Sequence, residues 1–381
     1  MTASLMRRYG NFELAEDSTQ EACVEALRSW PSQGIPSRPG AWLRTVAQRR
    51  ALDRLRRDQR FATKVGGMSF PKAESGDDRL SLMFACCHPS LSRDAQVALT
   101  LRTVAGLTTA QIARAFLSSE SSVAQRITRA KRKIVDAAIP FRMPATADLE
   151  ARVAEVLSVL YLMFNEGYLA SGWETAQDRS LAEDAAWLAA LVAQVLPAQA
   201  EVLGLLALFK LQLSRVGSRF AADGSMVMLA DQDRSLWDQR AIREATELLD
   251  RAAALEQPGP YQLQAAIASC HATAATWSTT DWSVLVRLYD RLLQLQPSPV
   301  VRLNRAVALW HVSGAEAALT ETDALLPELQ RYHLLHSTRG ELLRDLGREE
   351  EAQEAWKSAL ALTLNPAERR HLHARAGERA S

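Results

Sequence analysis

The side chains best suited to chemistry in this sequence follow a short turn near Gly106, within residues 106–131. Hydroxyl, amide and guanidinium groups on an exposed helix face can pair with DNA base edges, and cations beside them can bind phosphates. This chemistry is recognition rather than bond making. We predict that the following residues face a major groove: Ser121, Ser122, Gln125, Arg126 and Arg129. Lys131, with Arg132 and Lys133, is predicted to reach phosphates.

The elements that must position these residues are two short helices. Thr108 or Thr109 can cap the first helix, and Ser118 or Ser119 can cap the second. The positions expected to face inward are Ile112, Ala113 and Phe116 in the first helix and Val123, Ile127 and Ala130 in the second. Two such helices joined by a tight turn predict a helix-turn-helix. The alternative is a plain amphipathic hairpin.

A second basic element is predicted at residues 41–60. Its apolar residues recur every four positions as Leu43, Ala47, Ala51 and Leu55, which is typical of a helix with one buried stripe. Its other faces carry Arg44, Arg49, Arg50, Arg54, Arg56, Arg57 and Arg60. Such a helix can follow a phosphate backbone, although a solvated face explains the same residues.

The helix before it is predicted at residues 13–30, with an acidic first turn and with Ala22, Leu27 and Trp30 as apolar positions. From Pro31 to Gly40, prolines and glycines predict a loop.

Catalytic and metal chemistry have little support. Cys86, Cys87 and His88 are adjacent, whereas the ligands of one tetrahedral metal site are usually separated, so we expect buried thiols that pack a helix end. Cys270 and His271 receive the same interpretation. No nucleophile–base pattern, glycine-rich phosphate loop or HExxH motif is found, and we expect no enzyme activity, cofactor or metal.

Composition supports a helical protein that meets nucleic acid. The 381 residues are 48% hydrophobic and 23% charged, and alanine and leucine dominate. The net charge is only +1, but residues 1–140 hold 22 Lys and Arg against 13 Asp and Glu, and the remainder holds 23 against 31. A basic part joined to an acidic part is typical of chains in which one portion binds nucleic acid. The cysteine spacing, the lack of a signal segment and the short apolar runs predict a cytoplasmic protein without membrane contact.

The chain is predicted to be all-α in four segments: residues 1–60, a linker at 61–77, residues 78–140, and residues 141–381. Three helices are expected within 92–135, and helix from about Leu149 to the end. Gly314 and Gly347 lie 33 residues apart, and Gly340 and Trp356 lie where a tetratricopeptide hairpin needs a small and an aromatic residue. The alternative for residues 150–280 is an irregular helical domain.

In combination these motifs resemble a known family. Residues 14–30 and 42–57 look like region 2 of extracytoplasmic-function (ECF) sigma factors, and residues 91–135 look like their region 4. Residues 141–381 resemble the tetratricopeptide-like extension of one ECF subgroup, in which residues 164–168, 259–267 and 298–308 have close counterparts.

The resemblance implies a sigma factor that binds core RNA polymerase, recognises a promoter and opens it. It implies polymerase contacts for Asp17, Gln20 and Glu21, and a flipped promoter base in the loop Pro31–Gly40. It implies minus-ten contacts for Arg49, Arg50, Asp53, Arg54 and Arg57, and minus-thirty-five contacts for Ser121, Ser122, Gln125, Arg126 and Arg129.

One departure concerns the start of the chain. Only about a dozen residues precede the Ala15-Glu16-Asp17 motif, so we expect region 2 to lack region 2.1, or this start site to lie downstream of the true one. We also expect an intramolecular contact between the acidic extension and the sigma regions, which would regulate them in cis. The alternatives are a helix-turn-helix regulator with a helical sensor domain, acting without polymerase, and a tetratricopeptide scaffold whose basic head is incidental.

Overall fold

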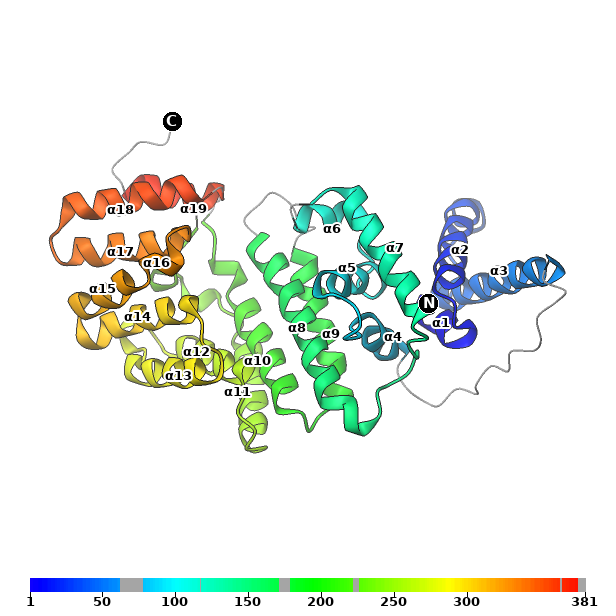
Figure 1. The fold of residues 1–381 in the computed structure, drawn as a ribbon, viewed down its shortest axis with the longest axis horizontal. Helices are drawn as coiled ribbons and strands as arrows, with labels where there is room; N and C mark the ends of the chain where they lie inside the picture. Colours follow the sequence, from blue (N-terminus) through cyan, green and yellow to red (C-terminus); the bar gives the residue numbers. More distant parts are fainter. Residues whose placement is uncertain (62–77, 117, 171–178, 222–225, 364, 376–381) are drawn as a thin grey trace. The chain divides into compact units, whose positions relative to one another are not determined.

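The computed structural model describes residues 1–61, 78–116, 118–170, 179–221, 226–363 and 365–375. Within these ranges the secondary structure is helical, with no strand beyond an isolated bridge between Phe220 and Met226 (Figure 1). The predicted all-α fold is therefore confirmed for the described residues. The chain divides into two compact units, residues 1–166 and 167–381. Apart from Phe61, the predicted linker 61–77 lies outside the described residues.

Unit 1 begins with α1 (Thr2–Tyr9), α2 (Phe12–Gln33) and α3 (Pro39–Phe61). The last two confirm the predicted helices 13–30 and 41–60. They pack against each other because small residues fill the contact, and the buried ones are Ala22, Ala26, Ala47 and Ala51. Leu43 and Leu55 of the predicted stripe are only partly buried.

Two details of α2 differ from the prediction. Pro31 does not start the loop, because α2 continues to Gln33 and ends at Gly34, whose φ is +80°. Pro31 lacks an amide donor, so α2 loses one intrahelical hydrogen bond there, but the Gly34 amide still closes the last turn on the Trp30 carbonyl at 2.9 Å. Leu27 is 77% exposed, because Ala22 and Ala26 already occupy the buried face of α2.

Region 78–140 contains α4 (Asp78–Cys86), α5 (Arg93–Thr103), α6 (Thr109–Ala115) and α7 (Glu120–Asp136). The three helices predicted within 92–135 are thus confirmed. The turn between α5 and α6 contains Gly106 at φ +78°, a conformation that favours glycine. Two contacts join this region to α8 (Thr146–Ala170). The Arg152 guanidinium of α8 donates a hydrogen bond to the Phe84 carbonyl of α4, and Arg93 of α5 pairs with Glu155 of α8 at 3.6 Å.

Unit 2 contains the last residues of α8 and the remaining helices. They are α9 (Arg179–Val195), α10 (Ala200–Ser214), α11 (Gln239–Ala253), α12 (Pro260–Thr273), α13 (Trp282–Leu295), α14 (Pro299–Ser313), α15 (Ala315–Ala324), α16 (Leu326–Leu329), α17 (His333–Asp345), α18 (Glu349–Leu362) and α19 (Pro366–Arg375).

A half-buried carboxylate joins α10 to α12. The Glu201 carboxylate accepts hydrogen bonds from the amides of Tyr261 at 2.9 Å and Gln262 at 3.0 Å, at the start of α12. These amides have no partner inside their own helix, and the positive end of the helix dipole favours a carboxylate there. Gly259 leaves room for this contact, because a Cβ on it would lie 2.2 Å from Glu201 Cδ. Burial nevertheless raises the pKa of Glu201.

The expectation of helix from Leu149 to the end is wrong for residues 215–221 and 226–238. These two stretches contain short 3₁₀ turns held by side chains. The Trp237 indole donates to Ser218 Oγ at 2.8 Å, and the Gln232 amide donates to the Val227 carbonyl at 3.0 Å. Such side-chain bonds replace the backbone bonds that a helix would have made.

The two glycines that suggested a repeat occupy equivalent turns. Gly314, at φ +86°, joins α14 to α15, and Gly347, at φ +74°, joins α17 to α18. In the second hairpin Gly340 lies against the buried Trp356, which is the small-on-aromatic packing expected from the sequence.

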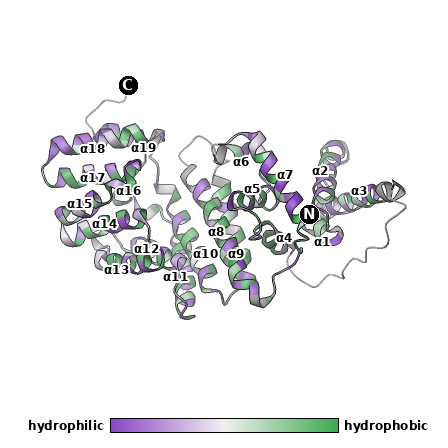
Figure 2. Cartoon of the chain, in the orientation of Figure 1, coloured by the Kyte–Doolittle hydropathy of each residue, from purple (hydrophilic) through white to green (hydrophobic). Residues whose placement is uncertain are grey.

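Hydrophobic residues concentrate in α8 to α10, whereas α7 is largely hydrophilic (Figure 2). Among the described helices, none is both long enough and apolar enough to cross a membrane.

Candidate nucleic-acid interface

The helix α7 has a buried stripe and an exposed polar face. Val123, Ile127 and Ala130 are buried as predicted, and Ile134 extends the stripe by one turn. The exposed face carries Ser121, Ser122, Gln125 and Arg129, while Arg126 is half-buried. The stripe fixes the helix against α5 and α6, so its other face is free to meet a partner.

Side-chain caps set the geometry of the turn before α7. Ser119 Oγ accepts a hydrogen bond from the Ser122 amide at 3.2 Å. At the start of α6, Thr108 Oγ1 accepts from the Gln111 amide at 3.2 Å, and the Thr108 amide donates to Gln111 Oε1 at 2.8 Å. The reciprocal pair stabilises the start of α6, and the single Ser119 cap stabilises the start of α7. The predicted helix-turn-helix is thus built as the sequence indicated.

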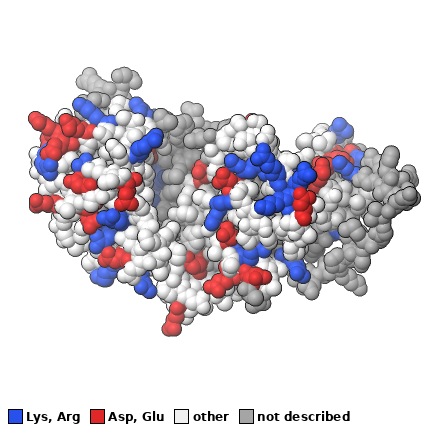
Figure 3. Space-filling model, viewed as in Figure 1, with Lys and Arg blue, Asp and Glu red and all other residues white. Residues whose placement is uncertain are grey.

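A groove of about 470 Å³ runs between α7 and the start of α5. It is lined by Leu91, Ser92, Ala95, Ser122, Gln125, Arg126, Arg129, Ala130 and Lys133. Arg126 pairs there with Asp94 at 3.6 Å, and Arg129 donates to Gln125 Oε1 at 3.2 Å. Figure 3 shows a dense cluster of basic side chains over α7. Four of the five residues that were predicted to face the DNA major groove therefore line this one basic groove of the protein.

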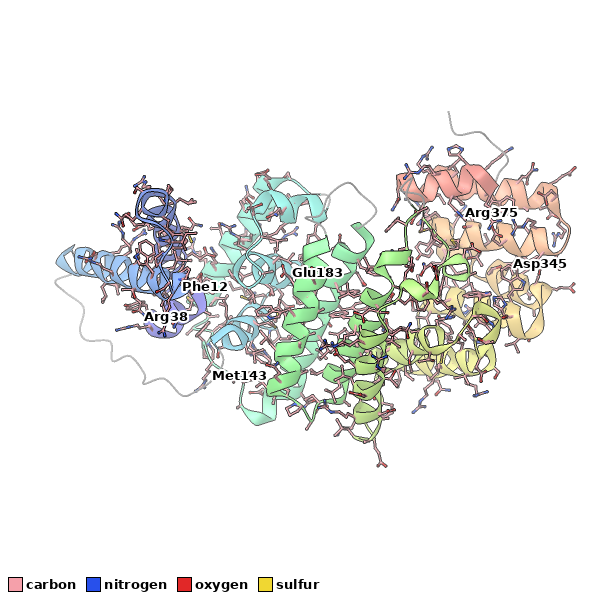
Figure 4. All side chains as sticks on the ribbon, turned by 180° about the vertical axis from the view of Figure 1, so that it is seen from behind. Phe12, Arg38, Met143, Glu183, Asp345 and Arg375 are labelled. Carbon is pink, nitrogen blue, oxygen red and sulfur yellow. The ribbon has the colours of Figure 1, made fainter. Side chains whose placement is uncertain are left out.

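Lys131 lies elsewhere than expected. Its ammonium pairs with the Glu16 carboxylate of α2 and lies 5.9 Å from the centroid of the Phe12 ring, at the start of α2 (labelled in Figure 4). Its side chain is 23% exposed and that of Glu16 is 17% exposed. Lys131 therefore faces region 2 in this structure.

Acidic side chains of α2 pair with arginines of α3. Arg54 pairs with Asp17 at 2.5 Å, and Arg50 pairs with Glu25 at 3.3 Å and with Glu21 at 3.8 Å. Residues predicted to bind polymerase thus neutralise residues predicted to bind DNA. All of these side chains are about 40–50% exposed.

The other predicted residues of region 2 differ in their exposure. Gln20 and Arg49 are exposed and Asp53 is half-buried, whereas the side chain of Arg57 lies outside the described residues.

Apolar surface on region 2 was missed by the sequence reasoning. Val24 is 45% exposed, Leu27 77% and Ile35 71%, and all follow the predicted polymerase contacts along the chain. Val24 and Leu27 lie four and seven residues after Gln20, and this spacing on one helix face could have revealed them. The loop beside them is supported by Trp30 and Trp42, whose rings meet edge-on at 5.5 Å.

Cys86 and Cys87 are both buried. Cys86 Sγ lies 3.2 Å from Thr103 Oγ1, and Cys87 Sγ lies 3.5 Å from Thr100 Oγ1. Burial raises the pKa of both thiols, that of Cys87 to about 12. In the part of the chain that the structure describes, no cluster of three or more His, Cys, Asp or Glu residues is arranged to hold a metal ion.

Comparison with known proteins agrees with this geometry. Residues 2–61 match the family described as Sigma-70 region 2, and residues 81–134 match Sigma-70, region 4. Residues 152–253 match a family of unknown function, DUF6596. The chain is 43% identical over 384 residues to the uncharacterized protein R00370 of Rhizobium meliloti (strain 1021), an alignment that covers 96% of this chain and 90% of that protein.

Proposed function

This chain belongs to the sigma-70 family of RNA polymerase sigma factors, and from that premise we propose that it is an ECF sigma factor with a tetratricopeptide-like extension. Sigma regions 2 and 4 bind core RNA polymerase and promoter DNA. The proposal assigns no bond-making chemistry to the chain, since the polymerase synthesises the RNA, and it places the protein in the cytoplasm.

The observation that carries the proposal is the two-sided helix α7. A buried stripe holds it in place, and its outer side chains line a basic groove. Guanidinium and amide groups in such a place can read base edges. We assign the minus-thirty-five contacts to Ser121, Ser122, Gln125, Arg126 and Arg129, and a phosphate contact to Lys131 once it leaves Glu16.

Region 2 supplies the second contact in this proposal. Its arginine helix α3 would meet the minus-ten element through Arg49, Arg50, Asp53, Arg54 and Arg57. Asp17, Gln20 and Glu21 on α2 would contact polymerase, where carboxylates meet a basic partner surface. The exposed side chains of Val24 and Leu27 extend this surface with apolar area, of the kind found in the centres of interfaces.

The direct test is reconstituted transcription with purified core polymerase on a promoter library. Arg129→Ala should reduce transcripts from the selected promoters about fivefold or more, because one base contact contributes roughly 1–3 kcal/mol. Arg251→Ala is the matched control, since it removes an exposed arginine from α11, far along the chain from both sigma regions. A protein that binds DNA specifically without associating with core polymerase would instead be a helix-turn-helix regulator.

We further propose that residues 167–381 regulate the sigma regions in cis. The proposal is supported by charge, because residues 1–166 carry a net charge of +7 and residues 167–381 a net charge of −6. A chain that ends at Ala170 keeps α8 and its contacts to region 4. If this shortened chain folds and matches the full chain in polymerase affinity and transcript yield, the regulatory role is refuted.

A further inference from the structure

One face of α2 binds cations from two other helices. Glu16, Asp17 and Glu21 lie within two turns of this helix, and they pair with Lys131 of α7, Arg54 of α3 and Arg50 of α3. We call these three carboxylates the acidic face of α2. The three cations are all among the residues assigned above to DNA, and two of the three carboxylates are assigned to polymerase.

We propose that the acidic face of α2 is a shared surface for which polymerase and the DNA-binding cations compete. In the free chain the carboxylates neutralise Arg50, Arg54 and Lys131. A basic polymerase surface that binds the same carboxylates breaks the pairs of Lys131 and Arg54 and leaves Arg50 paired with Glu25 alone. These cations can then bind promoter phosphates. The inference rests on the proposed function, because it names the partner by its opposite charge.

The ion pairs of Arg50 and Arg54 are exposed enough for their carboxylates to exchange one cation for another. The Arg50 and Arg54 pairs are about 40–50% exposed, and water screens ion pairs of this kind so that each changes an equilibrium by about fivefold at most. Another cation can therefore replace the arginine at little cost. Pairs buried deep in a core would not exchange in this way, because an abandoned partner would lose its compensating charge.

The Lys131–Glu16 pair differs because it joins residues 115 positions apart. It ties the recognition helix of region 4 to the start of region 2, and both side chains are less than one quarter exposed. Figure 3 shows acidic side chains directly beside the basic cluster of α7. While this pair is intact, Lys131 is not available to a phosphate, and α7 stays held against α2.

Neutral, nearly isosteric substitutions test the idea in the full chain. Glu16→Gln removes the ion pair with Lys131, and Asp17→Asn removes the ion pair with Arg54. The matched control is Glu13→Gln, which removes the same charge from an exposed position of the same helix, where the structure shows no ion pair with a described residue. The probe is a fluorescein-labelled 30-base-pair DNA duplex, with binding followed by anisotropy across a salt titration and without polymerase.

The expected result is DNA affinity about threefold to fivefold above that of Glu13→Gln for each released cation. The slope of log affinity against log salt should also steepen by roughly one for each cation released. Equal affinities and slopes for all three variants would overturn the inference, since general charge would then explain any gain. Circular dichroism checks that each variant is folded, and the two released cations, on different helices, give independent results.

A second arm separates this inference from the proposed function. Association of the wild-type chain with core polymerase is measured by co-elution, and failure of that association refutes the sigma assignment alone. If wild type associates and Asp17→Asn binds polymerase as tightly as Glu13→Gln does, the carboxylates are not the shared surface. Reduced polymerase affinity together with increased DNA affinity in Asp17→Asn supports competition.

Discussion

Replacing Gly340 by alanine has two opposite effects on the stability of the protein. Alanine favours a helix over glycine by about 1 kcal/mol, so propensity alone predicts a more stable α17. The new Cβ, however, would lie 2.3 Å from Nε1 and 2.5 Å from Cδ1 of Trp356. The Trp356 side chain is 1% exposed and is surrounded by the core of α15, α17 and α18, so it has little room to move.

Overpacking of a close-packed core costs roughly 1–3 kcal/mol, and distances this short indicate the upper end of that range. Subtracting the gain in propensity leaves a destabilisation of about 2 kcal/mol. For a unit of this size, that corresponds to a fall of roughly 4–8 °C in melting temperature. Differential scanning calorimetry of the full chain measures it directly.

Gly40→Ala is the control, because it adds a Cβ to a helical glycine that has nothing within 4 Å. This variant should be as stable as wild type or slightly more stable. If Gly340→Ala melts at or above the wild-type temperature, helix propensity outweighs packing, and the interpretation of this hairpin as tightly interlocked is wrong.

Three further predictions concern a helix cap, the cysteines and one ion-paired carboxylate. Glu201→Ala leaves two partly buried amides of α12 without their acceptor and should lower the free energy of unfolding by roughly 1–3 kcal/mol, measured by urea titration. An unchanged midpoint would contradict the capping role. In the native protein the exposed Cys23 should react rapidly with a thiol reagent, while Cys87, whose pKa burial raises to about 12, should react only after unfolding. Hydrogen bonds from Lys210 and Arg240 lower the pKa of Glu244 from 4.5 to about 2. Its folded pKa is depressed, so its stabilisation is complete above pH 4.5 and is lost as the pH falls towards 2. Because this side chain is about one-third exposed, the loss should be at most about 1 kcal/mol, and Glu244→Gln should not show it in melts across that pH range.

Local patterns predicted the helix-turn-helix well. The caps of α6 and α7 and the buried stripe of α7 depend on residues within one or two turns of each other, and such patterns are visible in a sequence. The same holds for the hairpin glycines, since a positive φ at a tight turn is a local requirement.

Contacts between distant residues could not be predicted in this way. The partner of Lys131 is 115 positions away, and that of Glu201 is about 60 positions away. A basic residue on a recognition helix is equally compatible with a phosphate and with a carboxylate from another helix. The exposure of Leu27 depends on which alanines face α3, and helical periodicity alone does not decide between adjacent faces.

The division of α7 into an inner and an outer side has an evolutionary consequence. Apart from Ala130, which belongs to both sets, its anchoring side chains share no position with those that line the groove, so the outer residues can be exchanged without disturbing the scaffold. Descendants of one ancestral gene could thus acquire different target sequences through a handful of codon changes, and a laboratory selection that varied only those codons could retarget the protein in the same manner.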